Sequence, residues 1–179
     1  MKRAAFLDRD GTLIADPGYV TEWAQVRLLP GVPAALRRLR AAGYLLVVVT
    51  NQSAVARGLC SEEQVRELHR RLGEELARAG AGIDAFYYSP YHPDGVIPAY
   101  RRDHPSRKPA PGMLQAAATD LGLDLPASFM IGDSLRDVEA GRAAGCRTVL
   151  LAPPTQPAPS PAPDFTAPDL PTAVRLLLG

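Results

Sequence analysis

Two aspartates lie two residues apart near the start of the chain. Asp8 and Asp10 follow a short apolar run, in the segment LDRDGT. In an extended chain this spacing places both side chains on one face, and Gly11 allows a sharp turn after them. Two carboxylates so close repel each other, and a hard divalent cation with oxygen ligands, usually magnesium, relieves that repulsion. The plain alternative is a surface turn, because aspartate and glycine are common turn residues.

Three further segments place reactive side chains after predicted strands. Thr50 and Asn51, in VVVTNQS, can donate hydrogen bonds to phosphate oxygens. Lys108 precedes a predicted helix and can neutralise a transferring phosphoryl group. Asp133 follows a fourth apolar run, and Asp137 is expected on the same helical face, where it would orient other groups. Each segment taken alone also has a structural interpretation, as a turn, a solvated lysine or a helix N-cap.

Short apolar runs alternate with helical patterns along the first part of the chain. This alternation predicts an α/β fold, with a doubly wound, Rossmann-like parallel sheet, helices on both faces and no large cap domain. Because the carboxyl ends of parallel strands meet at one edge, the four segments would come together there. Strands are expected at 3–7, 45–49, 83–88, 127–131 and 147–151, and helices at 32–42, 61–79, 111–121 and 135–144.

The end of the chain has a different composition. Residues 153–171 are rich in proline, which predicts an extended tether with polyproline-like conformation. Residues 172–178 are predicted to form a short helix that docks on the body. We therefore expect one domain over residues 1–151, to which the strap 152–179 belongs.

The composition is that of an ordinary globular protein. With 46% hydrophobic residues and a formal net charge of +1, the chain lacks the basic excess typical of nucleic-acid-binding proteins. Its apolar runs are too short to span a bilayer or to act as a signal peptide. Cys60 and Cys146 lie far apart, so no disulfide framework is expected. These features predict a cytoplasmic monomer that acts on a small molecule, with no nucleic-acid or membrane partner.

Taken together, the four segments resemble the motifs of the haloacid dehalogenase-like phosphatases over residues 3–151. Within that superfamily, DRDGT, NQSAVARG and RKPAPGM resemble the D-glycero-D-manno-heptose 1,7-bisphosphate 7-phosphatases, whereas histidinol-phosphate phosphatases share DRDGT and RKP. The resemblance implies a magnesium-dependent phosphomonoesterase in which Asp8 forms an aspartyl-phosphate and Asp10 is the general acid and base. It also implies magnesium ligands from Asp8, Asp133 and the backbone carbonyl of Asp10, and phosphoryl contacts from Thr50 and Lys108.

Other positions match the substrate site of the heptose bisphosphate phosphatases. Arg57 and Arg107 supply positive charge that suits a second phosphate on a small sugar phosphate. The resemblance places these residues at the substrate: Asp16, Pro17, Gly18, Tyr19, Asn51, Gln52, Ser53, Arg57, Arg107 and Ser134.

The loop after the third predicted strand departs from the family pattern. Many of these phosphatases hold a structural zinc there with three cysteines and a histidine, and the matching positions here are Ser89, Tyr91, His104 and Ser106. Because hydroxyl groups are poor zinc ligands, no structural zinc is expected. The loop would be held instead by its prolines and by packing of Tyr91 and Tyr100. The departure bears on substrate choice more than on the chemistry.

Other functions stay open at this point. A histidinol-phosphate phosphatase or a polynucleotide 3′-phosphatase would use the same chemistry, although the near-neutral charge counts against nucleic acid. A phosphotransferase would pass the same phosphoryl group to a sugar. A phospho-accepting switch domain that binds partners would share the doubly wound sheet. It needs no acid two residues after the phosphorylated aspartate, so Asp10 favours turnover.

Overall fold

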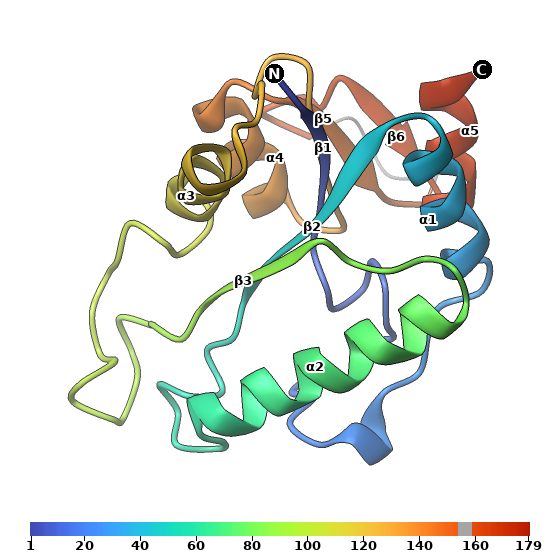
Figure 1. Ribbon diagram of the computed structural model, residues 1–179. Coiled ribbons are helices and arrows are strands. Elements are labelled where there is room, and N and C mark those ends of the chain that lie inside the picture. Colours follow the sequence, from blue (N-terminus) through green and yellow to red (C-terminus); the bar gives the residue numbers. More distant parts are fainter. Residues whose placement is uncertain (154–158) are drawn as a thin grey trace.

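Over residues 1–153 and 159–179, which the computed structural model describes, the chain forms six strands, five α-helices and one short 3₁₀ helix (Figure 1). The strands are β1 (Arg3–Leu7), β2 (Tyr44–Asn51), β3 (Ala85–Ser89), β4 (Phe129–Gly132), β5 (Arg147–Leu151) and β6 (Phe165–Ala167). The helices are η1 (Trp23–Gln25), α1 (Val32–Ala41), α2 (Glu62–Arg78), α3 (Gly112–Leu121), α4 (Leu135–Ala144) and α5 (Leu170–Leu178). No helix in the described ranges is long and apolar enough to cross a membrane.

All of these strands run parallel in one sheet. Their order is β3-β2-β1-β4-β5-β6, so the chain moves outward from β1 to β3, then returns to β4 and moves outward on the other side. This is the predicted doubly wound sheet, and its direction changes between β1 and β4. Ligands bind in open α/β sheets outside the carboxyl ends of the strands at such a point. The residues directly after β1 and β4 therefore lie where a site is expected.

Helices cover both faces of the sheet (Figure 1). α1, α2 and α5 pack on one face, where their buried residues share a core with Ala5 and Leu7 of β1. α3 and α4 pack on the other face, with Ala4 and Phe6. Alternate residues of β1 therefore face opposite cores, as expected for a strand that is buried on both sides.

α2 begins and faces the core for clear local reasons. The hydroxyl of Ser61 accepts a hydrogen bond from the backbone N–H of Gln64 (3.2 Å), and the Gln64 side chain accepts one from the N–H of Ser61 (2.9 Å). This capping box starts the helix. Apolar residues three and four positions apart then point inward, namely Val65, Leu68, Leu72 and Leu76.

The carboxyl end of β2 lies further along the chain than predicted. The sequence placed Thr50 and Asn51 after a strand that ended at residue 49, but both belong to β2. Thr50 pairs with Tyr88 and Asn51 with Ser89 in β3, so the ladder with β3 extends the strand. Both side chains still lie at the edge of the sheet where the site is expected.

The proline-rich segment is more structured than predicted. The sequence predicted an extended tether over 153–171, but Phe165–Ala167 forms β6 and pairs with β5. A strand of three residues is too short to leave a periodic signal. Its position is set by Asp164, whose carboxylate accepts hydrogen bonds from the N–H (2.7 Å) and hydroxyl (2.9 Å) of Thr148. Residues 154–158 of the predicted tether lie outside the described residues.

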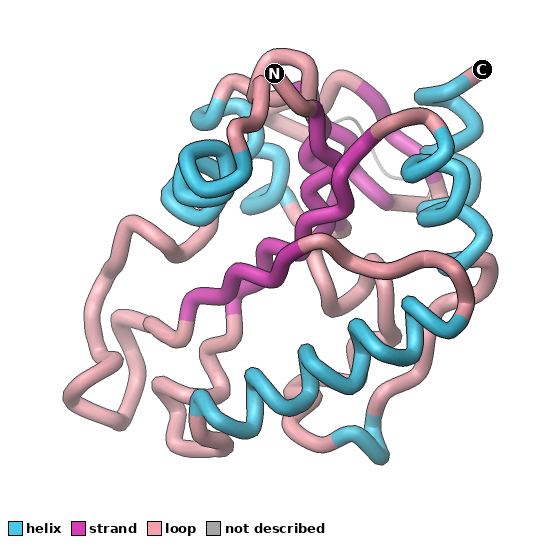
Figure 2. The backbone as a smooth tube through the Cα atoms, in the orientation of Figure 1, coloured by secondary structure: helices cyan, strands magenta, loops and turns pink. Residues whose placement is uncertain are grey.

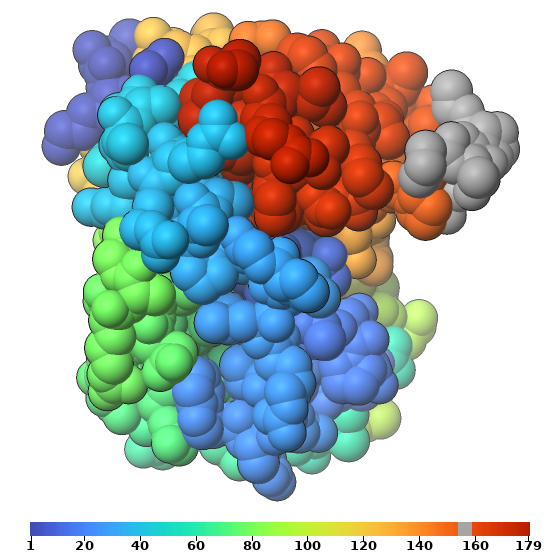
Figure 3. Space-filling view, turned by 90° about the vertical axis from the view of Figure 1, so that its right-hand side faces the viewer, coloured from blue at the N-terminus to red at the C-terminus, as the bar shows by residue number. Residues whose placement is uncertain are grey.

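α5 belongs to the core. Leu170, Ala173 and Val174 are buried and share the cluster that contains the buried face of α1. Figure 3 shows the red C-terminal segment lying against the light-blue segment that contains α1. The packing supports the expectation that the strap is part of the same domain.

Leu170→Ala should destabilise the whole domain. The side chain is 2% exposed, and truncation of a buried leucine costs about 2–5 kcal/mol in free energy of unfolding. Leu176→Ala is the matched control, because Leu176 is 56% exposed on the same helix and its truncation should change stability by less than about 0.5 kcal/mol. Urea unfolding followed by circular dichroism measures both. Equal small effects would show that α5 does not contribute to the core.

Candidate active site

Three carboxylates gather where the sheet changes direction. Asp8 follows β1, and its backbone N–H donates to the carbonyl of Ile131 in β4 (3.0 Å). Asp133 follows β4, and Asp137 lies in the first turn of α4. One oxygen from each carboxylate lies within 4.8 Å of the others. The structure thus brings Asp8 and Asp133 together and adds Asp137, the residue that the sequence placed on the same helical face as Asp133.

Two glycines let these carboxylates approach the backbone closely. Gly11 has a φ of 76°, and a Cβ there would overlap Oδ2 of Asp133. A Cβ at Gly132 would overlap Oδ2 of Asp137. A side chain at either position would displace a carboxylate from the cluster.

Lys108 is the buried cation of the site. Its side chain is 2% exposed, and Nζ lies 3.0 Å from Asp8 Oδ1, 2.6 Å from Asp137 Oδ1 and 2.8 Å from the carbonyl oxygen of Val49. Burial alone would lower the pKa of Lys108, but the charges of Asp8 and Asp137 outweigh it and raise the pKa above its usual value. The Asn51 amide accepts from the N–H of Lys108 (3.0 Å) and donates to its carbonyl (2.9 Å). Asn51 therefore holds the lysine as well as lining the site.

Asp10 is held from two sides. Nε and Nη2 of Arg9 each lie 3.1 Å from its Oδ1. Nε2 of Gln52 donates to Oδ2 of Asp10 (2.9 Å) and lies 2.8 Å from the hydroxyl of Thr50. Burial raises the pKa of Asp10, although the charge of Arg9 and the hydrogen bond from Gln52 oppose the rise. Thr50 is 1% exposed and lies beneath this network.

Most of the side chains described above line one pocket of about 330 Å³. Pro17 and Thr50, which were assigned to the site from the sequence, do not line it. The assigned residues that do line it are Asp8, Asp10, Asp16, Gly18, Tyr19, Asn51, Gln52, Ser53, Arg57, Arg107, Lys108, Asp133 and Ser134. Residues that were not assigned from the sequence also line it, namely Val20, His92, Arg136 and Asp137.

Positive groups gather in another part of the pocket. Nη2 of Arg57 lies 3.4 Å from Nε2 of His92, and Nη1 of Arg107 donates to the carbonyl of Tyr91 (3.1 Å). Burial and the charges of Arg136 and Arg57 lower the pKa of Arg107. Burial and the charges of Arg107 and Arg57 likewise lower the pKa of His92. Like charges so close are unfavourable by themselves, so this part of the pocket suits an anionic group.

Side-chain contacts hold together the loop between β3 and α3, which is drawn in pink in Figure 2. Oγ of Ser106 lies 2.9 Å from Oγ of Ser89 and 2.7 Å from Nδ1 of His104. The rings of Tyr91 and His104 stack with centroids 4.0 Å apart, and the Arg102 guanidinium lies 4.7 Å from the Tyr91 centroid. Hydrogen bonds and stacking therefore join the four positions at which the resemblance would place zinc ligands.

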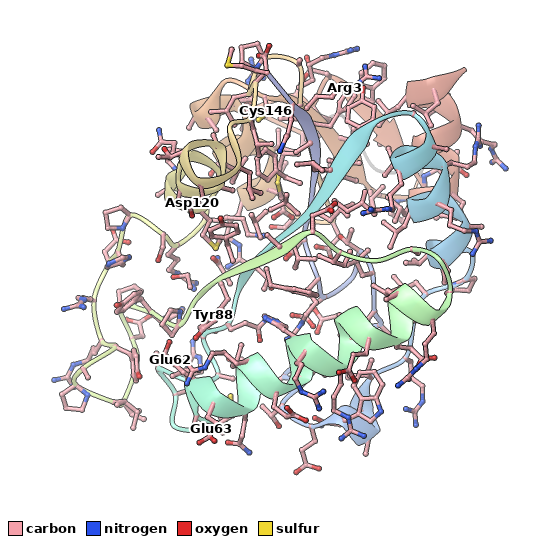
Figure 4. The ribbon with its side chains drawn as sticks, viewed as in Figure 1. Arg3, Glu62, Glu63, Tyr88, Asp120 and Cys146 are labelled. Carbon is pink, nitrogen blue, oxygen red and sulfur yellow. The ribbon has the colours of Figure 1, made fainter. Side chains whose placement is uncertain are left out.

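A second set of contacts ties this loop to α2. Glu62, at the start of α2, accepts hydrogen bonds from the hydroxyls of Tyr88 in β3 (2.8 Å) and Tyr100 in the loop (2.7 Å). Figure 4 shows Glu62 and Tyr88 close together at the amino end of α2. Tyr100 also packs near Tyr91, with ring centroids 5.9 Å apart, as the sequence predicted.

Comparison with known proteins places the chain in a family. Residues 105–173 match the HAD-hydrolase-like family model. The D-glycero-beta-D-manno-heptose-1,7-bisphosphate 7-phosphatase of Rhodopseudomonas palustris is 49% identical over 142 residues, which are 79% of this chain and 79% of that protein. The chain belongs to the heptose 1,7-bisphosphate 7-phosphatase family. The family member from Escherichia coli is 41% identical over 178 residues, which cover 96% of this chain and 93% of that protein.

Solved structures of the family share the fold. A putative HAD-like phosphatase from Mesorhizobium loti has a TM-score of 0.85 and 37% identity, and the match covers 98% of this chain and 87% of that one. The D,D-heptose 1.7-bisphosphate phosphatase from B. bronchiseptica, complexed with magnesium and phosphate, has a TM-score of 0.81 and 32% identity, with 98% of both chains covered. These matches confirm the predicted fold class and the predicted family.

The acidic cluster fits a hard divalent cation. Both oxygens of Asp137 have partners within the protein, Oδ1 with Lys108 (2.6 Å) and Oδ2 with the N–H of Ser134 (3.0 Å). Asp8 and Asp133 supply the other carboxylate oxygens of the cluster. Partial burial, followed by the charges of Asp8 and Asp137, raises the pKa of Asp133 to about 6, as expected where carboxylates lie close together. Oxygen donors of this kind suit magnesium.

We expect the loop between β3 and α3 to keep its structure without zinc. Among the described residues, no group of three or more His, Cys, Asp or Glu donors forms in this loop. A strong zinc chelator, added with magnesium in excess, should leave the unfolding temperature unchanged in scanning calorimetry. Ser106→Ala should instead destabilise the protein by about 1–3 kcal/mol, because it removes the hydroxyl between Ser89 and His104. Stoichiometric zinc in the purified protein would contradict this prediction.

Proposed function

We propose that this chain is a magnesium-dependent phosphatase that removes the 7-phosphate of D-glycero-D-manno-heptose 1,7-bisphosphate through an aspartyl-phosphate on Asp8. The observation that carries the proposal is the contact between Asp8 and Lys108, 3.0 Å apart at the carboxyl end of β1. In this contact the proposed nucleophile lies beside a fixed positive charge, in a pocket that also holds Asp10 and Asp133. The substrate is suggested by the names of the relatives from R. palustris and E. coli.

The first step transfers the phosphoryl group to the protein. A carboxylate oxygen of Asp8 attacks phosphorus, and the bond from phosphorus to the sugar oxygen breaks. Asp10 gives its proton to that oxygen, so the sugar leaves as an alcohol. Oδ1 of Asp8 is held by the N–H of Arg9 (2.8 Å) and by Lys108 (3.0 Å), which fixes the rotation of the carboxylate. A positioned general acid contributes about 10²–10⁴-fold to such a step.

The second step releases phosphate. Asp10, now a carboxylate, takes a proton from water as the water oxygen attacks phosphorus. The bond between phosphorus and Asp8 breaks, inorganic phosphate leaves and Asp10 is protonated again. Lys108 places positive charge beside the phosphoryl oxygens throughout. Asp8, Asp133 and the backbone carbonyl of Asp10 would hold magnesium, which when bound would neutralise phosphoryl charge and reduce its repulsion from the nucleophile.

The positive part of the pocket is suited to the second phosphate of the substrate. Arg57, Arg107, Arg136 and His92 line it, and the charges of the three guanidinium groups are unfavourable toward one another without an anion. Guanidinium groups bind phosphate through paired hydrogen bonds. A bisphosphate would therefore lie with one phosphate at Asp8 and the other at the arginines. Histidinol phosphate has a single phosphate and would leave the arginines without a partner.

The same chain is inferred to act as a monomer in the cytoplasm on this small sugar phosphate. Cys60 and Cys146 are free thiols, as is usual in a reducing compartment. The exposed large apolar residues are spread over distant segments, among them Tyr19, Val96 and Leu176. Scattered residues of this kind are normal on a monomer.

Asp8→Asn should abolish phosphate release from the heptose bisphosphate. Without the carboxylate no aspartyl-phosphate can form, and we expect turnover to fall by more than about 10³-fold. Glu74→Gln, on the exposed face of α2, is the control and should keep wild-type turnover. Phosphate release is followed with and without magnesium, and phosphorus NMR identifies heptose 1-phosphate as the product. Magnesium-dependent phosphate release from histidinol phosphate alone would mean that histidinol phosphate, and not the heptose bisphosphate, is the substrate. No release from any monoester would contradict the proposed phosphatase activity.

Arg107→Ala should weaken binding of the bisphosphate selectively. A charge-assisted hydrogen bond contributes about 1.5–3 kcal/mol, so KM for the bisphosphate should rise by about tenfold to a hundredfold. KM for heptose 7-phosphate, which lacks the second phosphate, should change little. Arg101→Ala is the matched control, because Arg101 is exposed and does not line the pocket. An equal rise in KM for both substrates would place Arg107 at the transferred phosphate instead.

A further inference from the structure

Arg9 is a fully buried arginine at the centre of a polar network. Its side chain is 1% exposed, and among the described residues its ion-pair partner is Asp10. Nη2 also donates to Oε1 of Gln52 (2.9 Å) and to the carbonyl of Val20 (3.3 Å). Nη1 lies 3.1 Å from Nε2 of His69 in α2. An arginine stays charged when buried, so each of these partners is needed to stabilise the guanidinium there.

His69 meets Arg9 as a neutral hydrogen-bond acceptor. Its side chain is buried, and the ring stacks on Phe86 with centroids 4.9 Å apart and meets the edge of Tyr88 at 5.8 Å. Burial, followed by the charge of Arg9, lowers the pKa of His69 to about 3. A guanidinium can only donate hydrogen bonds, so the unprotonated Nε2 must accept. The two aromatic residues of β3 therefore fix the ring, and the ring fixes Nη1 of Arg9.

His69 does not touch the substrate site. It does not line the pocket that holds Asp8 and Asp10, within the part of the chain that the structure describes. Arg9 lies between it and Asp10, with Nε and Nη2 on Oδ1. Any effect of His69 on the reaction must therefore pass through Arg9. A catalytic carboxyl needs to be held within about 0.5 Å and 10–20° of its working geometry, which requires supporting contacts of this kind.

We propose that His69 is a positioning residue for the general acid. It anchors Arg9, and Arg9 with Gln52 presents the carboxyl of Asp10 to the oxygen that leaves with the sugar. As the bond from phosphorus to that oxygen breaks, Asp10 gives up its proton, and the adjacent guanidinium stabilises the carboxylate that remains. The inference rests on the proposed role of Asp10, and it adds a residue on α2, sixty positions from Arg9 in the sequence, that acts without contacting substrate.

The positioning role differs from a purely structural one in its dependence on the leaving group. A sugar alcohol is a poor leaving group and must be protonated as it departs. A nitrophenolate is a stable anion and leaves without a proton. If His69 acts through Asp10, its loss should slow transfer of the phosphoryl group to Asp8, and so lower kcat/KM, only for the first kind of leaving group. If His69 merely stabilises the fold, both reactions should change together.

The test compares kcat/KM of the holoenzyme, with magnesium, on heptose 1,7-bisphosphate and on p-nitrophenyl phosphate, because kcat/KM reports the step that releases the leaving group and not the later hydrolysis of the aspartyl-phosphate. His69→Leu removes the acceptor but keeps an apolar side chain under Phe86, and we expect kcat/KM on the sugar to fall by about 10–100-fold. We expect kcat/KM on the aryl phosphate to change by less than about threefold. His69→Gln, which carries an oxygen acceptor near the position of Nε2, should recover most of the loss on the sugar.

Two further variants distinguish a failure of the positioning role from a failure of the proposed function. Leu76→Ala, a buried truncation on the same helix, should lower the unfolding temperature and leave the ratio of the two kcat/KM values unchanged. Asp10→Asn should show the same selective loss on the sugar, to a larger extent. A selective loss in Asp10→Asn with an equal loss on both substrates in His69→Leu would overturn the positioning role and leave the proposed function standing. A wild-type protein that releases no phosphate from either compound would overturn the proposed function as well.

Discussion

The site depends on holding three carboxylates together against their mutual repulsion. Asp8, Asp133 and Asp137 have oxygens within 4.8 Å of one another, and two like unit charges about 4 Å apart repel by about 4 kcal/mol at an effective dielectric of 20. Lys108 offsets part of this repulsion from its buried position, and magnesium between Asp8 and Asp133 would offset the rest. The groups come from β1, β4, α4 and the segment before α3, so only the complete doubly wound sheet assembles them.

The pocket contains two charged regions, one with the carboxylates and Lys108 and the other with the arginines. The carboxylates and Lys108 lie where β1 and β4 end, while Arg57 and Arg107 supply positive charge without a carboxylate partner within hydrogen-bond distance among the described residues. A substrate with two phosphates can occupy both regions at once, with one phosphate in each. Substrate choice then rests on the arginines and on the loop that carries His92. The proposed chemistry rests mainly on the acidic cluster at the strand ends.

The sequence predicted those features whose signal is local. Apolar runs located the first five strands to within a few residues, and the rule that site residues follow strands brought Asp8, Asp133 and Lys108 together. The sequence missed β6, because three residues leave no periodic pattern and the hydrogen bonds from Thr148 to Asp164 that place it cross between segments. It also missed His69, which in the sequence is one more residue beside the apolar stripe of α2. Its contact with Arg9 joins residues sixty positions apart, so only the folded chain shows it. Arg136 and His92 line the pocket but were not assigned to it from the sequence. Their positions inside or beside recognised motifs could have indicated that they belong there.

The proposed mechanism passes the phosphoryl group through Asp8. Rapid acid quench of the enzyme during turnover of the heptose bisphosphate with magnesium, followed by digestion and mass spectrometry, would detect this intermediate. We expect the peptide containing Asp8 to gain the mass of one phosphoryl group, with the modification on Asp8 itself, and Asp8→Asn to show no gain. Steady release of phosphate with an unmodified peptide, or with the phosphoryl group on another residue, would contradict it.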